Sequence, residues 1–159
     1  MTLMLGDAIA ISLLKMRGFE KSHFSKFHPG GNLGKDLVKL SEVMHGIKEL
    51  PLVKENELMS KVLLIITKKS FGCVGVVNKS KNLVGIITDG DLRRNMKKNI
   101  INKMACEVMT KNPKMAKVDT LVGEALNMMN SKKITSLFVC TDKKPIGIVH
   151  IHDLLRLRT

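Results

Sequence analysis

The sequence predicts an α/β (α+β) protein in which two β-α-β-β-α units pack against each other. Its 159 residues contain an internal repeat: Glu42-Val43-Met44 recurs as Glu107-Val108-Met109, 65 residues later, and Asp91-Leu92 recurs as Asp153-Leu154, 62 residues later. Each copy also contains two apolar runs joined by a polar turn, which indicates a pair of strands. A unit of this size buries little surface by itself, so we expect the two copies to pack as a closed pair.

The first copy is predicted to span residues 40–104. Its first helix is indicated by an apolar stripe at helical spacing and by Asn56, a good N-cap residue. The stripe consists of Leu58, Val62, Ile65 and Ile66. Two buried strands are expected at Cys73–Val77 and Leu83–Thr88, and a second helix is expected to start at Asp89.

The second copy, residues 105–159, predicts the same elements in the same order. Asp119 or Thr120 is expected to cap a helix that places Ala125 and Met129 toward the core. The remaining elements are strands at Ser136–Cys140 and Ile146–His150 and a helix from His152.

Residues 1–39 lie outside the repeat. Leu3–Met16 is predicted to be a helix with Gly18 as its C-cap, and the following His28-Pro29-Gly30-Gly31 segment forbids regular structure. The helix has apolar residues on more than one face, so we expect it to be buried in something larger or to cause self-association.

Composition and charge exclude several classes of protein. No apolar run approaches the length of a membrane-spanning helix, and the N-terminus does not resemble a signal peptide, which predicts a cytoplasmic protein without a membrane partner. The three cysteines show no metal-binding spacing, and packing roles are expected for Cys73 and Cys140. The net charge of +13 is spread along the chain, and only 3% of the residues are aromatic, so nucleic acid is not an expected partner.

The first candidate site is the strand-to-helix turn at residues 85–94. The amides of a helix start favour an anion, Thr88 adds a hydroxyl, and Asp91 can accept hydrogen bonds from sugar hydroxyls. Arg93 is a candidate phosphate contact. These residues predict a nucleotide or phosphosugar site, and an ordinary helix-capping arrangement explains the same pattern equally well.

The second copy has His150, His152 and Asp153 at the equivalent turn. A phosphate or sugar contact by one histidine is favoured over a metal site, because the third ligand follows a strand–helix break. From the residues alone, a plain solvated cap is favoured over both. His28 by its spacing alone indicates a surface turn, and no metal site is expected.

The tandem units, with Gly85-Ile86-Ile87-Thr88 followed by Asp91-Leu92, resemble a pair of cystathionine β-synthase (CBS) domains. Together with motifs elsewhere, the chain resembles the C-terminal part of bacterial D-arabinose-5-phosphate isomerases. These motifs are Leu5-Gly6-Asp7-Ala8, Arg17-Gly18-Phe19, His28-Pro29-Gly30-Gly31, Val43-Met44-His45, Thr88 to Arg94 and His150 to Leu155.

The resemblance implies that residues 1–39 are the end of a sugar-isomerase domain, with His28 as a catalytic candidate. That family converts D-ribulose 5-phosphate to D-arabinose 5-phosphate for Kdo and lipopolysaccharide synthesis. Because most of the isomerase domain in that family lies upstream of this region, the chain alone is expected to be inactive. The missing part of the isomerase domain is an expected partner. A truncated gene product is one explanation.

The resemblance also implies that the CBS pair binds a regulatory nucleotide: cytidine-linked Kdo by pathway logic, or AMP or ATP as in CBS domains generally. We expect Thr88 and Asp91 to serve one cleft and His152 and Asp153 the other. No cofactor for catalysis is expected. The protein is expected to form a homo-oligomer. Two alternatives remain, a stand-alone nucleotide-binding module and an oligomerisation scaffold with empty clefts.

Overall fold

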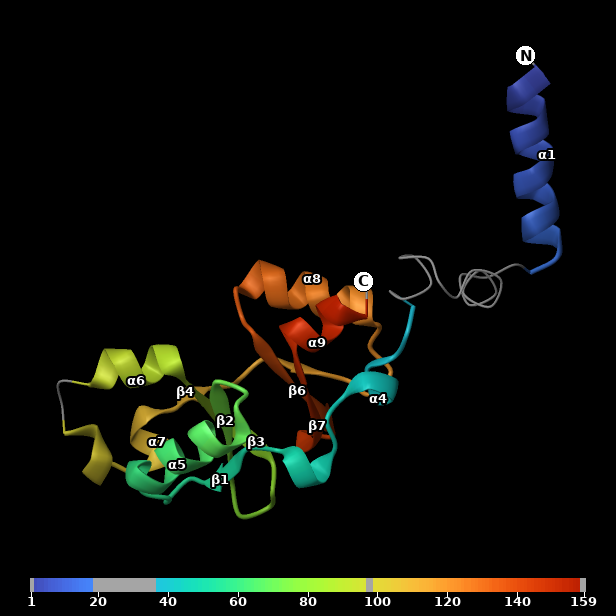
Figure 1. Ribbon diagram of the computed structural model, residues 1–159. Helices are drawn as coiled ribbons and strands as arrows, with labels where there is room; N and C mark the ends of the chain where they lie inside the picture. Colours follow the sequence, from blue (N-terminus) through green and yellow to red (C-terminus); the bar gives the residue numbers. More distant parts are fainter. Residues whose placement is uncertain (1, 19–36, 97–98, 158–159) are drawn as a thin grey trace.

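The computed structural model describes residues 2–18, 37–96 and 99–157 (Figure 1). Its first element is the helix α1, Thr2–Met16, which confirms the predicted helix. Gly18 follows with φ at 60°, the left-handed conformation expected of a cap glycine. All described side chains of α1 are exposed, including Leu5 at 63% and Ile9 at 54%. This helix therefore presents apolar surface along its length.

The first copy is built on the strands β1 (Leu52–Lys54), β2 (Cys73–Val77) and β3 (Leu83–Thr88). β1 runs parallel to β2, and β2 runs antiparallel to β3. The helices are α5 (Met59–Lys69) and α6 (Asp89–Asn95), with short turns α4 (Leu40–Val43), η1 (Ile47–Glu49) and η2 (Ile100–Asn102). The two predicted strands and the start of α6 are confirmed.

The second copy repeats this arrangement. Its three-stranded sheet contains β5 (Met115–Ala116), β6 (Ser136–Thr141) and β7 (Lys144–His150), and its helices α8 (Val122–Lys132) and α9 (Ile151–Arg156) cover that sheet (Figure 1). The short helix α7 (Ala105–Val108) and the strand β4 (Thr110–Lys111) precede β5. The fold is thus mixed α/β with two small sheets, as predicted.

The opening segment of each copy pairs with the sheet of the other copy. β4 adds to the first sheet, where Thr110 lies opposite Ile86, and His45 forms an antiparallel bridge with Ile148 in the second sheet. The methionines of the repeated Glu-Val-Met motif follow the same exchange: Met109 lies against Gly85 and Met44 against Gly147, so tightly that a Cβ at either glycine would overlap the thioether. The predicted boundaries 40–104 and 105–159 remain a prediction, and the structure adds this crossing of segments between the copies.

Three starts of helices differ from the prediction. α9 begins at Ile151 rather than at His152. α5 begins after Leu58 rather than after Asn56, and α8 begins after Leu121 rather than after Asp119 or Thr120. For α5 and α8, the reason is the crossing just described. The first helical amides donate to linker carbonyls, Met59 N to Lys103 O at 2.9 Å and Val122 N to Val38 O at 2.8 Å, so the backbone of the linker replaces a side-chain cap.

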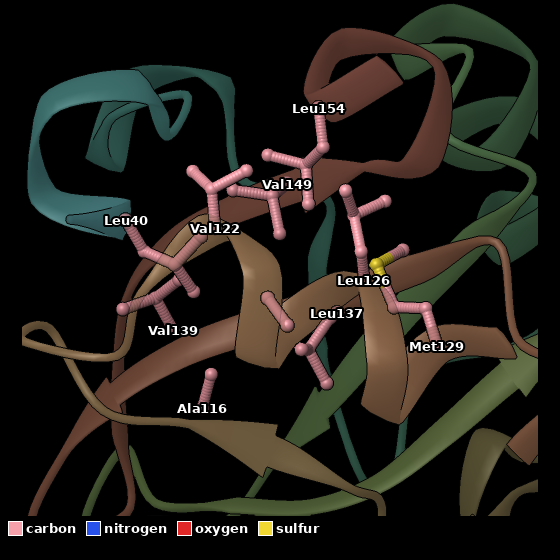
Figure 2. Packing of buried hydrophobic residues seen from close by; sticks show 10 residues of the cluster. Leu40, Ala116, Val122, Leu126, Met129, Leu137, Val139, Val149 and Leu154 are labelled. Atoms are coloured by element: carbon pink, nitrogen blue, oxygen red, sulfur yellow. The ribbon is translucent and has the colours of Figure 1, made fainter. Parts of the chain in front are cut away.

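The core consists of three clusters. One lies within the second copy and includes Leu40 from the first copy's opening segment; Figure 2 shows Leu40 among Val122, Val139 and Val149. Another lies within the first copy and includes Ala105 and Val108 from the second. The third fills the space between the two sheets, and its members are Leu50, Phe71, Cys73, Leu83, Phe138, Cys140 and Ile148. The copies therefore share a core, as their small size requires.

The packing roles predicted for the two strand cysteines are confirmed. Cys73 and Cys140 are 2% and 8% exposed, and all three cysteines are free. Burial raises the pKa of both thiols to about 11. Within the residues the structure describes, no helix is long and apolar enough to cross a bilayer.

Candidate functional site: two equivalent turns at the boundary between the copies

Asp91 lies at the start of α6 and is 4% exposed. Its Oδ2 accepts hydrogen bonds from the amide of Thr88 at 2.9 Å and from the hydroxyl of Thr88 at 2.7 Å. Its Oδ1 accepts from Thr110 Oγ1 at 2.8 Å and from Arg94 Nη2 at 2.6 Å. Burial alone would raise the pKa of this carboxyl, but the donors outweigh burial and lower the pKa.

The Thr88–Asp91 turn is thus a capping arrangement in which Thr88 is the N-cap of α6. All of the carboxylate's observed donors come from the protein itself, so a sugar hydroxyl would have to replace one of them. Arg93, the predicted phosphate contact, is exposed on the same helix. The nucleotide contacts of Thr88, Asp91 and Arg93 stay a prediction.

The second turn brings His150, His152 and Asp153 together at the start of α9. His150 is the N-cap, and its Nδ1 accepts from the amide of His152 at 3.3 Å. The two rings lie 5.0 Å apart between centroids. Burial lowers the pKa of His150, the neighbouring His152 and His45 lower it further, and Asp153 opposes them. The described residues contain no group of three or more side chains that could hold a metal ion.

His45, from the opening segment of the first copy, completes this second turn. Its Nε2 lies 3.0 Å from Asp153 Oδ2, and its Nδ1 lies 2.8 Å from Glu49 Oε2. The ring packs edge-on against Phe71 at 5.0 Å. Burial lowers the pKa of His45, but hydrogen bonds to Asp153 and Glu49 outweigh it, so the pKa is raised. A protonated ring can donate to both carboxylates at once.

The two turns are equivalent through the repeat. His45 and Thr110 each follow a Glu-Val-Met motif, and each contacts the aspartate of the other copy, Asp153 or Asp91. His45 and Thr110 were not among the predicted site residues. Their position directly after the repeated Glu-Val-Met motif could have indicated them, but only if the exchange of opening segments between the copies had been known.

A cleft of about 480 Å³ lies beside the second turn, at the boundary between the copies. It is lined by His45, Glu49, Lys68, Lys69, Ser70, Phe71, His150, His152, Asp153 and Arg156. Two lysines and an arginine outnumber the two carboxylates of the lining, and His45, whose pKa is raised, adds to the positive side, so the cleft favours an anion. Ser70 sits at the left-handed C-cap of α5, and Lys69 Nζ donates to the carbonyl of Lys48 at 2.7 Å. The cleft contains His150, His152 and Asp153 from the prediction and draws its other wall from the first copy.

A larger cleft of about 920 Å³ was not predicted. It is lined by Ile47, Leu50, Leu52, Lys54, Glu55, Asn56, Val77, Asn78, Lys79, Lys81, Lys144 and Pro145. None of the predicted site residues belongs to it. Its walls come from three separate segments, so no local motif marks it. His28, the catalytic candidate, lies outside the described residues.

Comparison with known proteins identifies a domain family and several relatives. A family model for the CBS domain matches residues 40–98 and 105–159. An uncharacterised protein of Rickettsia prowazekii is 44% identical over 155 residues, which are 98% of this chain and 49% of that protein. The arabinose 5-phosphate isomerase KdsD of Yersinia pestis is 41% identical over 158 residues, which are 98% of this chain and 48% of that enzyme. The chain spans about half the length of the curated relatives it matches.

Solved structures agree on the fold. The CBS-domain pair of the protein MJ0100, solved in complex with 5′-methylthioadenosine and S-adenosyl-L-methionine, superposes with a TM-score of 0.68 at 24% identity. The superposition covers 76% of this chain and 95% of that one. The tandem arrangement predicted from the repeat is confirmed.

Proposed function

The chain belongs to the CBS-domain family, and from this premise we propose that it is the regulatory CBS pair of an arabinose 5-phosphate isomerase, with a nucleotide or nucleotide-sugar as its ligand. The observation that carries the proposal is the cationic cleft of about 480 Å³ between the copies. A ligand there touches both copies, so its binding changes how they sit together.

The chemistry of the cleft supports an anionic ligand that also offers hydroxyl groups. Lys68 and Arg156 lie where they can attract phosphate, while Asp153 and Glu49 are acceptors for sugar hydroxyls. MJ0100, a protein of the same fold, was solved with two adenosine derivatives, which supports a nucleoside as part of the ligand.

Two ligand classes follow, one from the kinship with the isomerases and one from CBS domains generally. Cytidine-linked Kdo is the end product of the pathway that such an isomerase feeds, and its binding would make the pair a feedback sensor. AMP or ATP would make it a sensor of energy state. In either case Thr88, Asp91 and Arg93 form the second candidate position, at the equivalent turn.

The CBS pair regulates a sugar isomerisation. That reaction takes place in an isomerase domain whose C-terminal end is residues 1–39. His28 remains the catalytic candidate from this chain, as an acid or base in an enediol mechanism without a cofactor. The exposed apolar side chains of α1 support contact with that domain or with a second copy of the chain in a cytoplasmic homo-oligomer.

The proposal is tested by calorimetric titration of the chain with cytidine-linked Kdo, CMP, AMP and ATP. His152→Ala changes an exposed residue of the cationic cleft, and Arg93→Gln is the matched change at the other turn. We expect His152→Ala to weaken binding at least five-fold and Arg93→Gln to leave it within two-fold. The reverse pattern moves the ligand to the Thr88–Asp91 turn. No heat with any of the four contradicts the proposal and favours an oligomerisation scaffold.

A further inference from the structure

The cleft of about 920 Å³ lies apart from both turns and has a different chemistry. Its floor is aliphatic: Leu50 is 7% exposed, and Leu52 and Val77 are half-buried against the cluster between the sheets. Ile47, 71% exposed, stands at its edge, and Pro145 closes the side formed by the second copy. A cleft of this size with a mainly apolar lining has the dimensions of a small-molecule site.

Charge around this floor is strongly one-sided. Four lysines line the cleft, Lys54, Lys79, Lys81 and Lys144, and Glu55 is the single carboxylate among the lining residues. All four lysines are exposed. These lysines come from two strands and a turn around a mainly apolar cavity, which favours a ligand with an apolar body and an anionic head.

The walls are held in place by contacts between the copies. The amide of Leu83 donates to the carbonyl of Lys143 at 2.8 Å, which joins the β2–β3 turn of the first copy to the β6–β7 turn of the second. The amide of Lys81 donates to Asn78 O at 2.9 Å and fixes the turn that carries two of the lysines. The cleft is thus formed by packed segments rather than by one loop.

We propose that this cleft is a second ligand site, separate from the nucleotide cleft, and that it binds an aliphatic carboxylate. The chain of the ligand lies on Leu50, Leu52 and Val77, and its carboxylate lies among the lysines at the rim. Residues of both copies line this cleft, as they line the nucleotide cleft. The short helix η1 contributes Ile47 to this cleft and Glu49 to the nucleotide cleft, so both ligands would contact the interface between the copies.

The test is calorimetric titration of the full chain with decanoate, with octanoate and decanol as comparison probes. Each buried methylene contributes a factor of about four to affinity, so octanoate is expected to bind about fifteen-fold more weakly. Decanol lacks the charge and is expected to bind at least ten-fold more weakly. Equal binding of decanol, or no binding of decanoate, overturns the proposal.

Variants separate this site from general attraction to a basic protein. Lys79→Gln with Lys144→Gln is expected to weaken decanoate at least five-fold, whereas Lys114→Gln with Lys117→Gln, the same charge change at exposed positions outside both clefts, leaves it within two-fold. Equal weakening by both pairs overturns the proposal.

A third variant places a repelling carboxylate in the cleft. Ile47→Glu is expected to abolish decanoate binding, and Leu64→Glu, at a leucine that is also 71% exposed, is its matched control. Both should keep the melting temperature within 2–3 °C, as surface changes do. If Ile47→Glu removes AMP or CMP binding as well, the two clefts act as one nucleotide site and the proposal of a second site is wrong.

Discussion

Asp91 and Asp153 hold equivalent positions in the two copies but differ in their surroundings. Asp91 is buried with hydrogen bonds to Thr88, Thr110 and Arg94, while Asp153 is half-buried and shares His45 with Glu49. A saturated carboxylate stabilises a fold, and a carboxylate held by a titratable ring can be released. The first turn is therefore the more structural of the two, and the second the more adaptable.

Asp91→Ala is expected to destabilise the chain by about 3 kcal/mol at pH 7, because it leaves the partly buried amide and hydroxyl of Thr88 and the hydroxyl of Thr110 without their acceptor. The pKa of Asp91 is lowered by folding, so its contribution is present above the unfolded pKa of about 4 and is lost as the pH falls further. Urea unfolding at pH 7 and pH 3 measures both effects. Asp89→Ala, at the exposed neighbour, is the control, and an equal loss there would refute the assignment.

His45→Gln tests the contact between the copies at the second turn. Folding raises the pKa of His45, so its stabilisation is full below the unfolded pKa of about 6.5 and disappears as the pH rises through the folded pKa. Because the ring is partly exposed, the difference between wild type and variant is expected to stay under about 1 kcal/mol. Thermal unfolding at pH 5.5 and pH 8.5 measures it. A difference that grows with pH contradicts the assignment.

At the scale of the elements, the four hairpin strands followed from the sequence, whereas the strand β4 and the starts of three helices did not. Cys73–Val77 and Leu83–Thr88 are apolar runs between polar turns, a local signal that survives in the fold. Asn56 is a good cap by type, yet α5 begins after Leu58, because the carbonyl of Lys103 satisfies the Met59 amide. That acceptor lies 44 residues away in the chain, so no local pattern near Met59 predicts it.

The candidate sites show the same limit. His150, His152 and Asp153 were found as one run of sequence, and they do line a cleft. His45, Lys68 and Lys69 line the same cleft from the other copy: the exchange of opening segments places His45, and the packing of the two copies places the lysines of α5. Residues of a cleft that follow one another in a single turn can be predicted from the sequence. Residues that the other copy contributes to the same cleft cannot.

The contact of Met109 with Gly85 gives a prediction about that exchange. Gly85→Ala places a methyl group where the Met109 side chain lies and is expected to cost about 1–3 kcal/mol. Gly46→Ala, which meets nothing within 4 Å, is the control and should change stability by under about 0.5 kcal/mol. Chemical denaturation compares them. Equal stability of Gly85→Ala and wild type would show that β4 does not need this close approach.

At the scale of the whole molecule, the shared core makes the two copies interdependent. Leu40 is fully buried in the cluster of the second copy, and Ala105 and Val108 are buried in that of the first. A fragment cut at the sequence repeat therefore leaves out part of its own core and keeps part of the other.

Fragments test this interdependence. Residues 46–112 contain β1 to β4 and the complete cluster of the first copy, whereas residues 40–104 lack Ala105, Val108 and β4. We expect the 46–112 fragment to melt more cooperatively by circular dichroism than the 40–104 fragment, of nearly equal length, because both lack part of the cluster between the sheets but only 46–112 keeps the whole cluster of the first copy. Equally cooperative melting of the 40–104 fragment would mean that the exchange contributes little.

The exchange of opening segments also sets the order in which the two sheets and their cross-copy contacts can form during synthesis. The bridge from His45 waits for Ile148, near the end of the chain, while the first sheet is complete once β4 has left the ribosome. The segment that joins residues 1–39 to the CBS pair is thus among the last to be fixed. A nascent chain stalled between β4 and β7 would hold a finished first sheet while His45 still lacked its partner Ile148, so the opening segment of the first copy is fixed only after β7 has been made.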